Sequence, residues 1–560
     1  MRQYGLGFIV GILLLTMIGC ARMDVPFGME MSSSGGNQWD RLALEKNQSL
    51  DLEKLQLSSY AEKAGAQLSS PRYQTFAVNE RFRVKGSAAR HAAFQSDVAW
   101  IEVVKKGTGS SEENTFSYYA PLREGRFDQD VRLFDGKGTY QVTVRLPSME
   151  EEDRFYDIAR FEVINVNPRK YRDIAYTRAG RQAGLYIEQP ARGRVAADGR
   201  FKLQGRTKDL GVKRLMLRLE KGDRHWEQLI SVKNGAFYTE VPLLYGKGEH
   251  KLTVMLPDPQ RDRYFNEGAS LLIDNRSSAK KEPIVYFKHY QERGVKLTYP
   301  LAGGDKADMK YRIRGQIDPD APFAKETKHL IVQTKKDGLD ATYFVPVKNY
   351  RFDGFFWLRF GPGKYEVTVN VPEITQEQRD YFRFFGVARF HVVNTAQKDL
   401  RNLLPSRGIQ SDSPAIRQLA EDLTRGKRTD REKALAIYEY VAKTMDYDVH
   451  KFRTDAFEYD DSALKALREK TGVCQDYSFL AAALLRSIQM ETRFVQGFAE
   501  GNRHAWIEVK VDGRWLTMDP TWGSGYLDGS GKFVKRYTTE YFDPNPAVFS
   551  KTHTRTGVLY

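Results

Sequence analysis

Residues 472–488 read GVCQDYSFLAAALLRSI, and this stretch decides how the C-terminal part of the chain folds. The run after Tyr477 consists mostly of small and apolar residues, which is typical of a buried helix. This helix is expected to begin at or just before Cys474, which places the sulfur at a helix N-terminus. Unpaired backbone N–H groups and the helix dipole there favour a thiolate, the nucleophilic form of cysteine. Gly472 is expected to allow a sharp backbone turn and close access for a substrate.

Residues 504–511, HAWIEVKV, alternate as a strand that begins at His504. The Asp-Gly pair at 512–513 is a strong signal for a two-residue hairpin turn, and the return strand 514–518 leads to Asp519. Pairing residues outward from the turn places His504 and Asp519 near each other on adjacent strands. The carboxylate can therefore orient the imidazole.

The blocks GVCQDY and HAWIEVKVDGRWLTMDPTW, in the order Cys, His, Asp, resemble the transglutaminase-like superfamily. This superfamily has a papain-like Cys-His-Asp fold and includes animal transglutaminases, peptide N-glycanase and proteins of the kyphoscoliosis-peptidase type. The resemblance spans residues 429–546. It implies an α+β domain in which Cys474 is the nucleophile, His504 the general base and acid, and Asp519 the group that orients the imidazole.

The same resemblance implies supporting roles around this triad. Trp506 and Trp522 match the family pattern as structural or substrate supports, as does Pro520, whereas Gln475 lies beside the nucleophile without a defined role. Backbone N–H groups at Cys474 are expected to contribute to an oxyanion hole, with the second donor left unassigned. No cofactor and no metal are expected.

The chemistry implied is acyl transfer on protein or peptide amides through a thioester. Water as the acyl acceptor gives a protease or amidase, which we favour, and a lysine amine gives a protein-crosslinking transglutaminase. A third interpretation is a non-catalytic cell-surface binding module, because a lone strand histidine, an Asp before Pro and a buried tryptophan are each more often structural.

The first twenty residues predict export. Arg2 precedes an apolar stretch at 6–18, and residues 17–20 read MIGC, which resembles the lipobox of bacterial lipoproteins with Met in place of the usual Leu. The resemblance implies cleavage before Cys20 and lipidation of that cysteine. A plain secretory signal or an uncleaved anchor are the alternatives. We therefore expect an extracytoplasmic, membrane-anchored lipoprotein of a bacterium.

Cysteine usage strengthens the case for a nucleophile. The chain has two cysteines, so if Cys20 is lipidated then Cys474 is the only remaining thiol. An intramolecular disulfide and a multi-cysteine metal site are then excluded. An inert buried thiol, an intermolecular bridge or a nucleophile remain.

Composition describes an ordinary globular protein of several domains: 560 residues, 41% hydrophobic and 28% charged. The formal net charge of +15 suits anionic partners in general. Outside the cytoplasm, membrane headgroups or an anionic cell-wall polymer are the expected counter-charge, and nucleic acid is not an expected partner.

The region before residue 400 contains three copies of one strand-rich pattern. Each copy closes on a similar segment, GKGTYQVTVRLP, GKGEHKLTVMLP and GPGKYEVTVNVP, and these end at Pro147, Pro257 and Pro372, which are 110 and 115 residues apart. Short alternating strands and Gly-containing turns with this period favour tandem immunoglobulin-like β-sandwiches over a solenoid. A stalk role and a binding role for them are both open.

The predicted organisation is therefore multidomain, with three tandem β-sandwich repeats followed by the α+β transglutaminase-like domain. The expected ranges are 1–19 for the signal peptide, 20–69 for a tether with a possible short helix, 70–168, 185–277 and 294–396 for the repeats, and 410–560 for the C-terminal domain.

Overall fold

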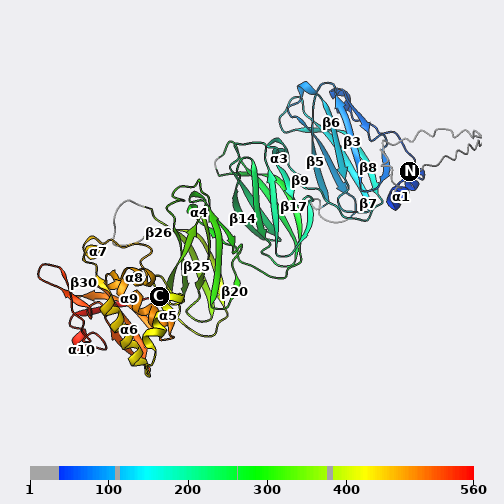
Figure 1. Cartoon of the computed structure of the whole chain (residues 1–560). Helices are drawn as coiled ribbons and strands as arrows, with labels where there is room; N and C mark the ends of the chain where they lie inside the picture. The colour runs from blue at the N-terminus through cyan, green and yellow to red at the C-terminus, as the bar shows by residue number, and fades with distance from the viewer. Residues whose placement is uncertain (1–36, 108–113, 262, 375–382) are drawn as a thin grey trace, which may run out of the picture.

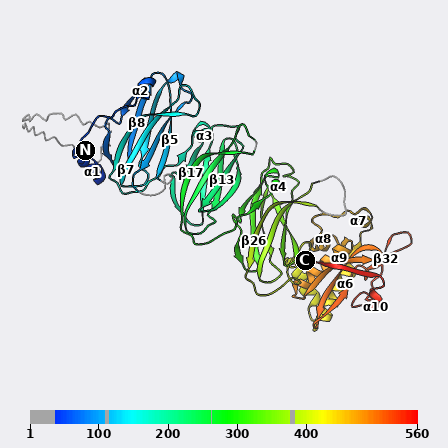
Figure 2. The same ribbon diagram turned by 180° about the vertical axis from the view of Figure 1, so that it is seen from behind.

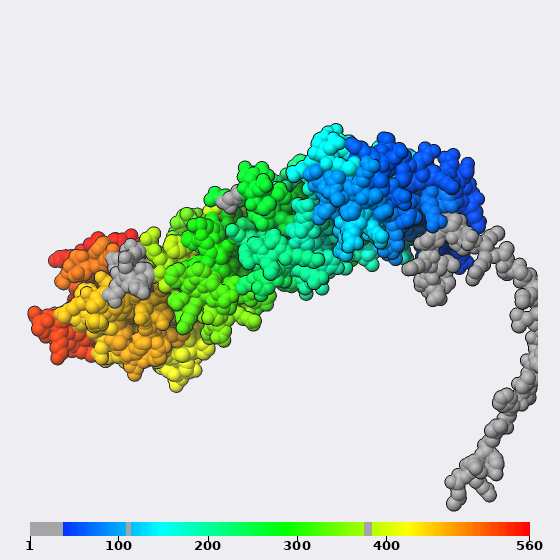
Figure 3. Space-filling model, turned by 90° about the horizontal axis from the view of Figure 1, so that it is seen from above, coloured from blue at the N-terminus to red at the C-terminus, as the bar shows by residue number. Residues whose placement is uncertain are grey.

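The computed structural model describes residues 37–107, 114–261, 263–374 and 383–560. The predicted signal peptide, the lipidation site at Cys20 and the first part of the tether lie outside these ranges. Within them, none of the helices is both long and apolar enough to cross a membrane. The folded units follow one another in an elongated arrangement, with the N-terminal helices at one end and a helix-rich unit at the other (Figures 1 and 3).

Two helices precede the β-rich region, α1 (Gln38–Gln48) and α2 (Ser59–Ala64). Asn37 and Asp40 form a capping box at the start of α1. At its other end, the buried Asn47 side chain donates to Ala77 O at 2.8 Å and accepts from Ala77 N at 2.7 Å. These bonds tie α1 to strand β2 (Thr75–Val78) of the first β unit.

The first β unit consists of two sheets, β1-β3-β6 and β2-β8-β7-β4-β5, that enclose one hydrophobic core. Its strands are β1 Ala66–Ser70, β2 Thr75–Val78, β3 Arg81–Ala88, β4 Val98–Lys105, β5 Thr115–Pro121, β6 Arg126–Arg132, β7 Gly138–Pro147 and β8 Phe155–Asn165.

The second β unit has the same arrangement, with sheets β10-β12-β15 and β11-β17-β16-β13-β14 around its own core. Its elements are β9 Ala175–Tyr176, α3 Arg178–Gln182, β10 Tyr186–Gln189, β11 Arg194–Ala197, β12 Arg200–Arg206, β13 Arg214–Lys221, β14 Arg224–Ser231, β15 Ala236–Pro242, β16 Gly248–Pro257 and β17 Phe265–Asn275.

In the third β unit the two layers are joined, because the long strand β23 pairs with β22 at one end and with β24 at the other. The strand order is β18-β26-β25-β22-β23-β24-β21-β19. The elements are β18 Val285–Tyr286, α4 Lys288–Glu292, β19 Val295–Tyr299, β20 Asp305–Ala307, β21 Lys310–Ile317, β22 His329–Lys336, β23 Leu339–Lys348, β24 Arg351–Trp357, β25 Gly363–Pro372 and β26 Phe384–Asn394.

The recurring glycines and asparagines of the sequence have equivalent contacts in the three β units. A Cβ at Gly86, Gly205 or Gly315 would lie 2.4–2.5 Å from a phenylalanine ring of the facing strand. Only glycine leaves room for the ring at these positions. The buried side chains of Asn165, Asn275 and Asn394 each donate to a glycine carbonyl at 2.9 Å. The N-terminal region is thus mostly β-sheet, and its core contacts recur along the chain.

The C-terminal unit packs helices against the sheet β31-β30-β29-β34 around a fourth core. Its helices are α5 Pro414–Thr424, α6 Asp430–Thr444, α7 Val449–Thr454, α8 Ala463–Glu469, α9 Cys474–Ser487 and α10 Pro546–Phe549. Its strands are β27 Asp446–Tyr447, β28 Thr471–Gly472, β29 Thr492–Ala499, β30 Asn502–Val511, β31 Arg514–Met518, β32 Gly525–Leu527, β33 Phe533–Lys535 and β34 His553–Leu559.

Helix α9 lies at the centre of this unit. Most of its residues are buried, as the apolar run predicted, and it contacts α5, α6 and α8 as well as β30. The last strand, β34, pairs with β29, and Tyr560 beyond it packs against the core of the third β unit. The C-terminus therefore lies at the junction of these two units, which both ribbon views show (Figures 1 and 2).

Candidate active site

Cys474 is the first residue of α9, with Val473 as the N-cap, and its side chain is partly buried. The structure therefore places the sulfur at the helix N-terminus, where the sequence predicted it. At this position the thiol faces the positive end of the helix dipole.

The turn before Cys474 is fixed by a buried ionic network. The Asp476 carboxylate accepts the backbone N–H of Val473 at 2.9 Å. Lys451 lies 2.9 Å from both Asp476 and the buried Asp461. Burial raises the pKa of Asp476, and the Lys451 ammonium opposes that shift. This network holds the backbone at the start of α9.

The structure gives Gly472 a steric role that the sequence did not indicate. Gly472 is not among the glycines with positive φ. A Cβ there would lie 2.5 Å from the Cβ of Asp476, so the residue is glycine because the capping carboxylate occupies the adjacent space.

His504 and Asp519 are brought together by the β30–β31 hairpin. Val511 pairs with Arg514 across the two-residue turn at 512–513, which is the register expected from the sequence. His504 Nε2 lies 2.7 Å from Asp519 Oδ2, and 7% of the His504 side chain is exposed. Because Nε2 contacts Asp519, Nδ1 is the ring nitrogen left for Cys474, whose side chain lies close enough to raise the pKa of His504.

The protonation of His504 and Asp519 is determined by their burial and by the hydrogen bond between them. Burial lowers the pKa of His504, but the charge and hydrogen bond of Asp519, with a smaller contribution from Cys474, raise it to about 10. Burial raises the pKa of Asp519, but the imidazoles of His504 and His553 outweigh this effect and hold the pKa of Asp519 well below its usual range. The pair is therefore imidazolium and carboxylate at neutral pH, and a cationic ring beside the sulfur favours the thiolate.

Asp519 is completely buried, and each of its oxygens has two partners. Oδ1 accepts the backbone N–H groups of Thr521 at 2.9 Å and of Trp522 at 3.1 Å. Oδ2 lies 2.7 Å from His504 Nε2 and 3.2 Å from His553 Nε2. The carboxylate is thus held by four donors in a site without solvent.

The predicted supports lie around this chain of hydrogen bonds. The Trp506 and Trp522 rings each have centroids 6.1 Å from that of His504, and Trp506 is 3% exposed. Both rings shield the imidazole from water. The amide nitrogen of Gln475 is buried without a hydrogen-bond partner in the described structure.

His553 was missed by the sequence analysis. It is one of nine histidines, it lies 34 residues after Asp519, and the surrounding KTHTR has no motif that would mark it. His504, Asp519 and His553 offer ligand atoms within 4.8 Å of one another and could hold a metal ion. Direct hydrogen bonds among the same three groups satisfy them without an ion, and they are the basis of the proposals below.

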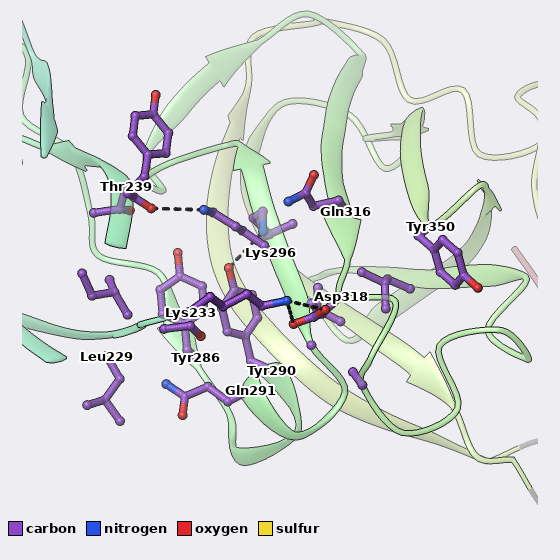
Figure 4. Close-up of a pocket in the computed structure, with 18 of the residues that line it drawn as sticks. Leu229, Lys233, Thr239, Tyr286, Tyr290, Gln291, Lys296, Gln316, Asp318 and Tyr350 are labelled. Atoms are coloured by element: carbon purple, nitrogen blue, oxygen red, sulfur yellow. Dashed lines mark hydrogen bonds and ion pairs between the residues drawn. The ribbon is translucent and has the colours of Figure 1, made fainter. Parts of the chain in front are cut away.

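A cavity of about 670 Å³ lies far from Cys474, between the second and third β units. Tyr286, Tyr290 and Lys296 line it, and it is crossed by an ion pair of 2.6 Å between Lys233 and Asp318 (Figure 4). None of the residues that line it belongs to the C-terminal unit.

Comparisons with known proteins bear on the C-terminal unit. The family model of the transglutaminase-like superfamily matches residues 417–520, a range that contains Cys474, His504 and Asp519. The kyphoscoliosis peptidase of Homo sapiens is 31% identical over 152 residues, which cover 24% of this chain and 22% of that protein. For the Mus musculus protein the figures are 30% over 154 residues, 25% and 23%. The chain thus spans less than a quarter of the length of these two curated relatives.

A solved structure of a TGase is 19% identical, with a TM-score of 0.19, and the match covers 31% of this chain and 48% of that one. A likeness of that size supports no argument. The superfamily assignment depends instead on the family model and the two relatives.

Proposed function

Because residues 417–520 belong to the transglutaminase-like superfamily, we propose that the chain is a cysteine-dependent acyl-transfer enzyme acting on protein or peptide amides. The observation that carries the proposal is the hydrogen bond between His504 and the buried Asp519, together with a Cys474 side chain close enough to the same imidazole to raise its pKa. A cysteine, an imidazole and an orienting carboxylate in this order are the parts that nucleophilic acyl transfer requires.

In the first half-reaction the Cys474 proton resides on His504 Nδ1 and the thiolate attacks the amide carbonyl carbon. The resulting oxyanion is stabilised by backbone N–H groups at the start of α9. His504 then gives its proton to the departing amine nitrogen, the C–N bond breaks, and a thioester on Cys474 remains. Asp519 keeps the ring oriented and stabilises its cationic form.

In the second half-reaction an acceptor attacks the thioester. With water, His504 takes a proton from it, the C–S bond breaks, the thiol is restored and a carboxylic acid leaves. We propose this hydrolytic course, a protease or amidase, for the chain. With a lysine amine the same steps give a crosslink, so amine incorporation into a glutamine peptide is the measurement that separates a transglutaminase from a hydrolase.

Reactivity of Cys474 towards iodoacetamide tests the proposal. A full-length Cys20→Ala variant carries Cys474 as its only thiol, so intact mass reports that residue alone. We expect fast labelling at neutral pH and a loss of about 30-fold in a His504→Ala variant, because an ordinary thiol is only about 3% ionised at pH 7. An ordinary rate that the histidine change leaves untouched refutes catalysis and favours the binding-module alternative.

We also propose that the enzyme is an extracytoplasmic lipoprotein attached through Cys20, with the β-rich region acting as a stalk of three immunoglobulin-like repeats. The MIGC segment and the elongated arrangement of units support this (Figure 3). The net charge of +15 suits an anionic cell-wall polymer as a further partner. Metabolic labelling with a fatty-acid analogue tests the anchor: the label is expected in the wild type and absent from Cys20→Ala, and equal labelling of both contradicts it.

A further inference from the structure

The orienting carboxylate has a second imidazole partner. Asp519 Oδ2 lies 3.2 Å from His553 Nε2 and 2.7 Å from His504 Nε2. The two histidines come from different strands, since His504 lies on β30 and His553 is the first residue of β34. One oxygen atom therefore links the two imidazoles.

The surroundings of His553 fix its ring. Its side chain is completely buried. The Phe549 ring stacks on it with centroids 3.8 Å apart and planes 12° apart, and the Trp522 and Trp506 rings approach its plane nearly edge-on, at 4.5 and 5.5 Å. The ring has little room to rotate, so its hydrogen bond to Asp519 has a defined direction.

Both nitrogens of the His553 ring have a partner. Thr552 Oγ1 lies 2.8 Å from His553 Nδ1, closer than its contact of 3.2 Å with Phe549 O. Because the partner of Nε2 is a carboxylate oxygen, which only accepts, Nε2 carries a proton and donates it to Asp519. His553 thus supplies a hydrogen bond to the carboxylate while Thr552 contacts its other nitrogen.

We propose that His553 is a positioning residue that acts through Asp519, so that the functional unit is a chain of four side chains, Cys474, His504, Asp519 and His553. This inference assumes the proposed function. A buried carboxylate oxygen that loses one of its two donors gains no water in exchange. Without His553, Oδ2 keeps His504 alone, and the carboxylate is freer to turn or to take up a proton. Either change weakens its hold on the catalytic ring.

The titratable groups around this unit determine how a pH profile is interpreted. Asp519 and His504 are the charged groups that His553 faces among its described contacts, and the other rings against it, those of Trp506, Trp522 and Phe549, do not titrate. The phenols whose charge would act on Asp519 or Cys474 have raised pKa values because they are buried: Tyr438, Tyr447, Tyr477 and Tyr541.

The test measures the rate of Cys474 alkylation against pH in the full-length Cys20→Ala background. His553→Phe removes the N–H donor and keeps an aromatic ring that can pack against Phe549, Trp506 and Trp522. His553→Gln keeps an N–H group of similar reach. We expect the Phe variant to react about 10-fold more slowly near pH 6, with the acidic limb of the profile moved upward by about one unit. The rate of the Gln variant is expected to stay within about 3-fold of the wild-type rate. A His250→Phe control, at a buried histidine of the second β unit, is expected to react at the wild-type rate.

A double variant separates positioning from general destabilisation. If His553 acts through Asp519, adding His553→Phe to Asp519→Asn produces no further loss. A full additional loss in that background overturns the inference, as does a folded His553→Phe variant that matches wild type at every pH. If the Phe variant does not fold, Thr552→Val removes the hydroxyl that contacts His553 Nδ1 and is expected to slow alkylation about 3-fold. An unchanged rate there then overturns the inference.

These outcomes distinguish the two proposals. An activated wild-type thiol that His553 variants leave unchanged refutes the positioning role alone. An ordinary wild-type thiol refutes the proposed function, and the role of His553 with it.

Discussion

Replacing Asp519 with asparagine removes the negative charge beside His504 while keeping the shape of the side chain. The amide can still accept the backbone N–H groups of Thr521 and Trp522 through its oxygen. What it cannot do is stabilise a cationic His504. Asp519→Asn therefore isolates the electrostatic contribution of the carboxylate.

The magnitude follows from the two opposing influences on His504. Burial lowers its pKa, and Asp519 raises it to about 10. With the charge removed, burial is expected to bring this pKa below the ordinary imidazole value of about 6.5. The ring is then neutral at pH 7, and Cys474 has no cation beside it. An ordinary thiol is about 3% ionised at that pH, so the rate of alkylation is expected to fall about 30-fold.

The assay is iodoacetamide labelling of Cys474, followed by intact mass from pH 5 to pH 9, with circular dichroism to show that the variant is folded. Asp412→Asn, at an exposed aspartate of the same unit, is the matched control and is expected to react like wild type. A loss of less than about 3-fold in Asp519→Asn, or an equal loss in the control, refutes the electrostatic reasoning.

Three further predictions concern metal, packing and pH. Chelation with EDTA is expected to leave the labelling rate unchanged, because direct hydrogen bonds among the three buried groups satisfy them; a loss restored by zinc indicates a metal centre. Gly472→Ala is expected to lower the free energy of unfolding by about 1–3 kcal/mol and to slow labelling, since the new Cβ would lie 2.5 Å from Asp476 Cβ. Gly529→Ala is the control, because a Cβ at Gly529 meets nothing within 4 Å. Equal unfolding midpoints of the two variants contradict the prediction. Because the pKa of His504 is raised to about 10, the contribution of His504 to stability is complete below about pH 6.5 and is lost as the pH rises through about 10. The pKa of Asp519 is lowered, so its contribution to stability is present above about pH 4 and is lost on acidification. Tryptophan fluorescence during urea unfolding at several pH values measures this, and a difference between wild type and Asp519→Asn that does not vary with pH contradicts it.

Short-range patterns predicted the part of the site that lies within one helix and one hairpin. An apolar run placed Cys474 at the start of a helix, since the helical pattern extends over neighbouring residues. The two-residue turn at 512–513 fixed the strand register, because both residues adopt the positive φ that an Asp-Gly pair tolerates. Counting from that turn was enough to place His504 beside Asp519.

The rest of the site depends on contacts between distant segments, which local patterns do not encode. His553 reaches Asp519 because β34 pairs with β29, across more than fifty residues, and no local feature indicates that pairing. The steric reason for Gly472 depends on where the side chain of Asp476 points. In the β-rich region the repeated glycines and asparagines were visible in the sequence, whereas the continuous sheet through β23 was not.

Ultraviolet absorbance of the thiolate tests the central claim most directly, because it observes the ion pair without any substrate. The difference spectrum between the Cys20→Ala variant and one that also carries Cys474→Ala reports Cys474 alone. We predict a thiolate signal already present at neutral pH that disappears in His504→Ala. A signal that emerges only in alkaline solution, at the same pH with and without the histidine, contradicts the account.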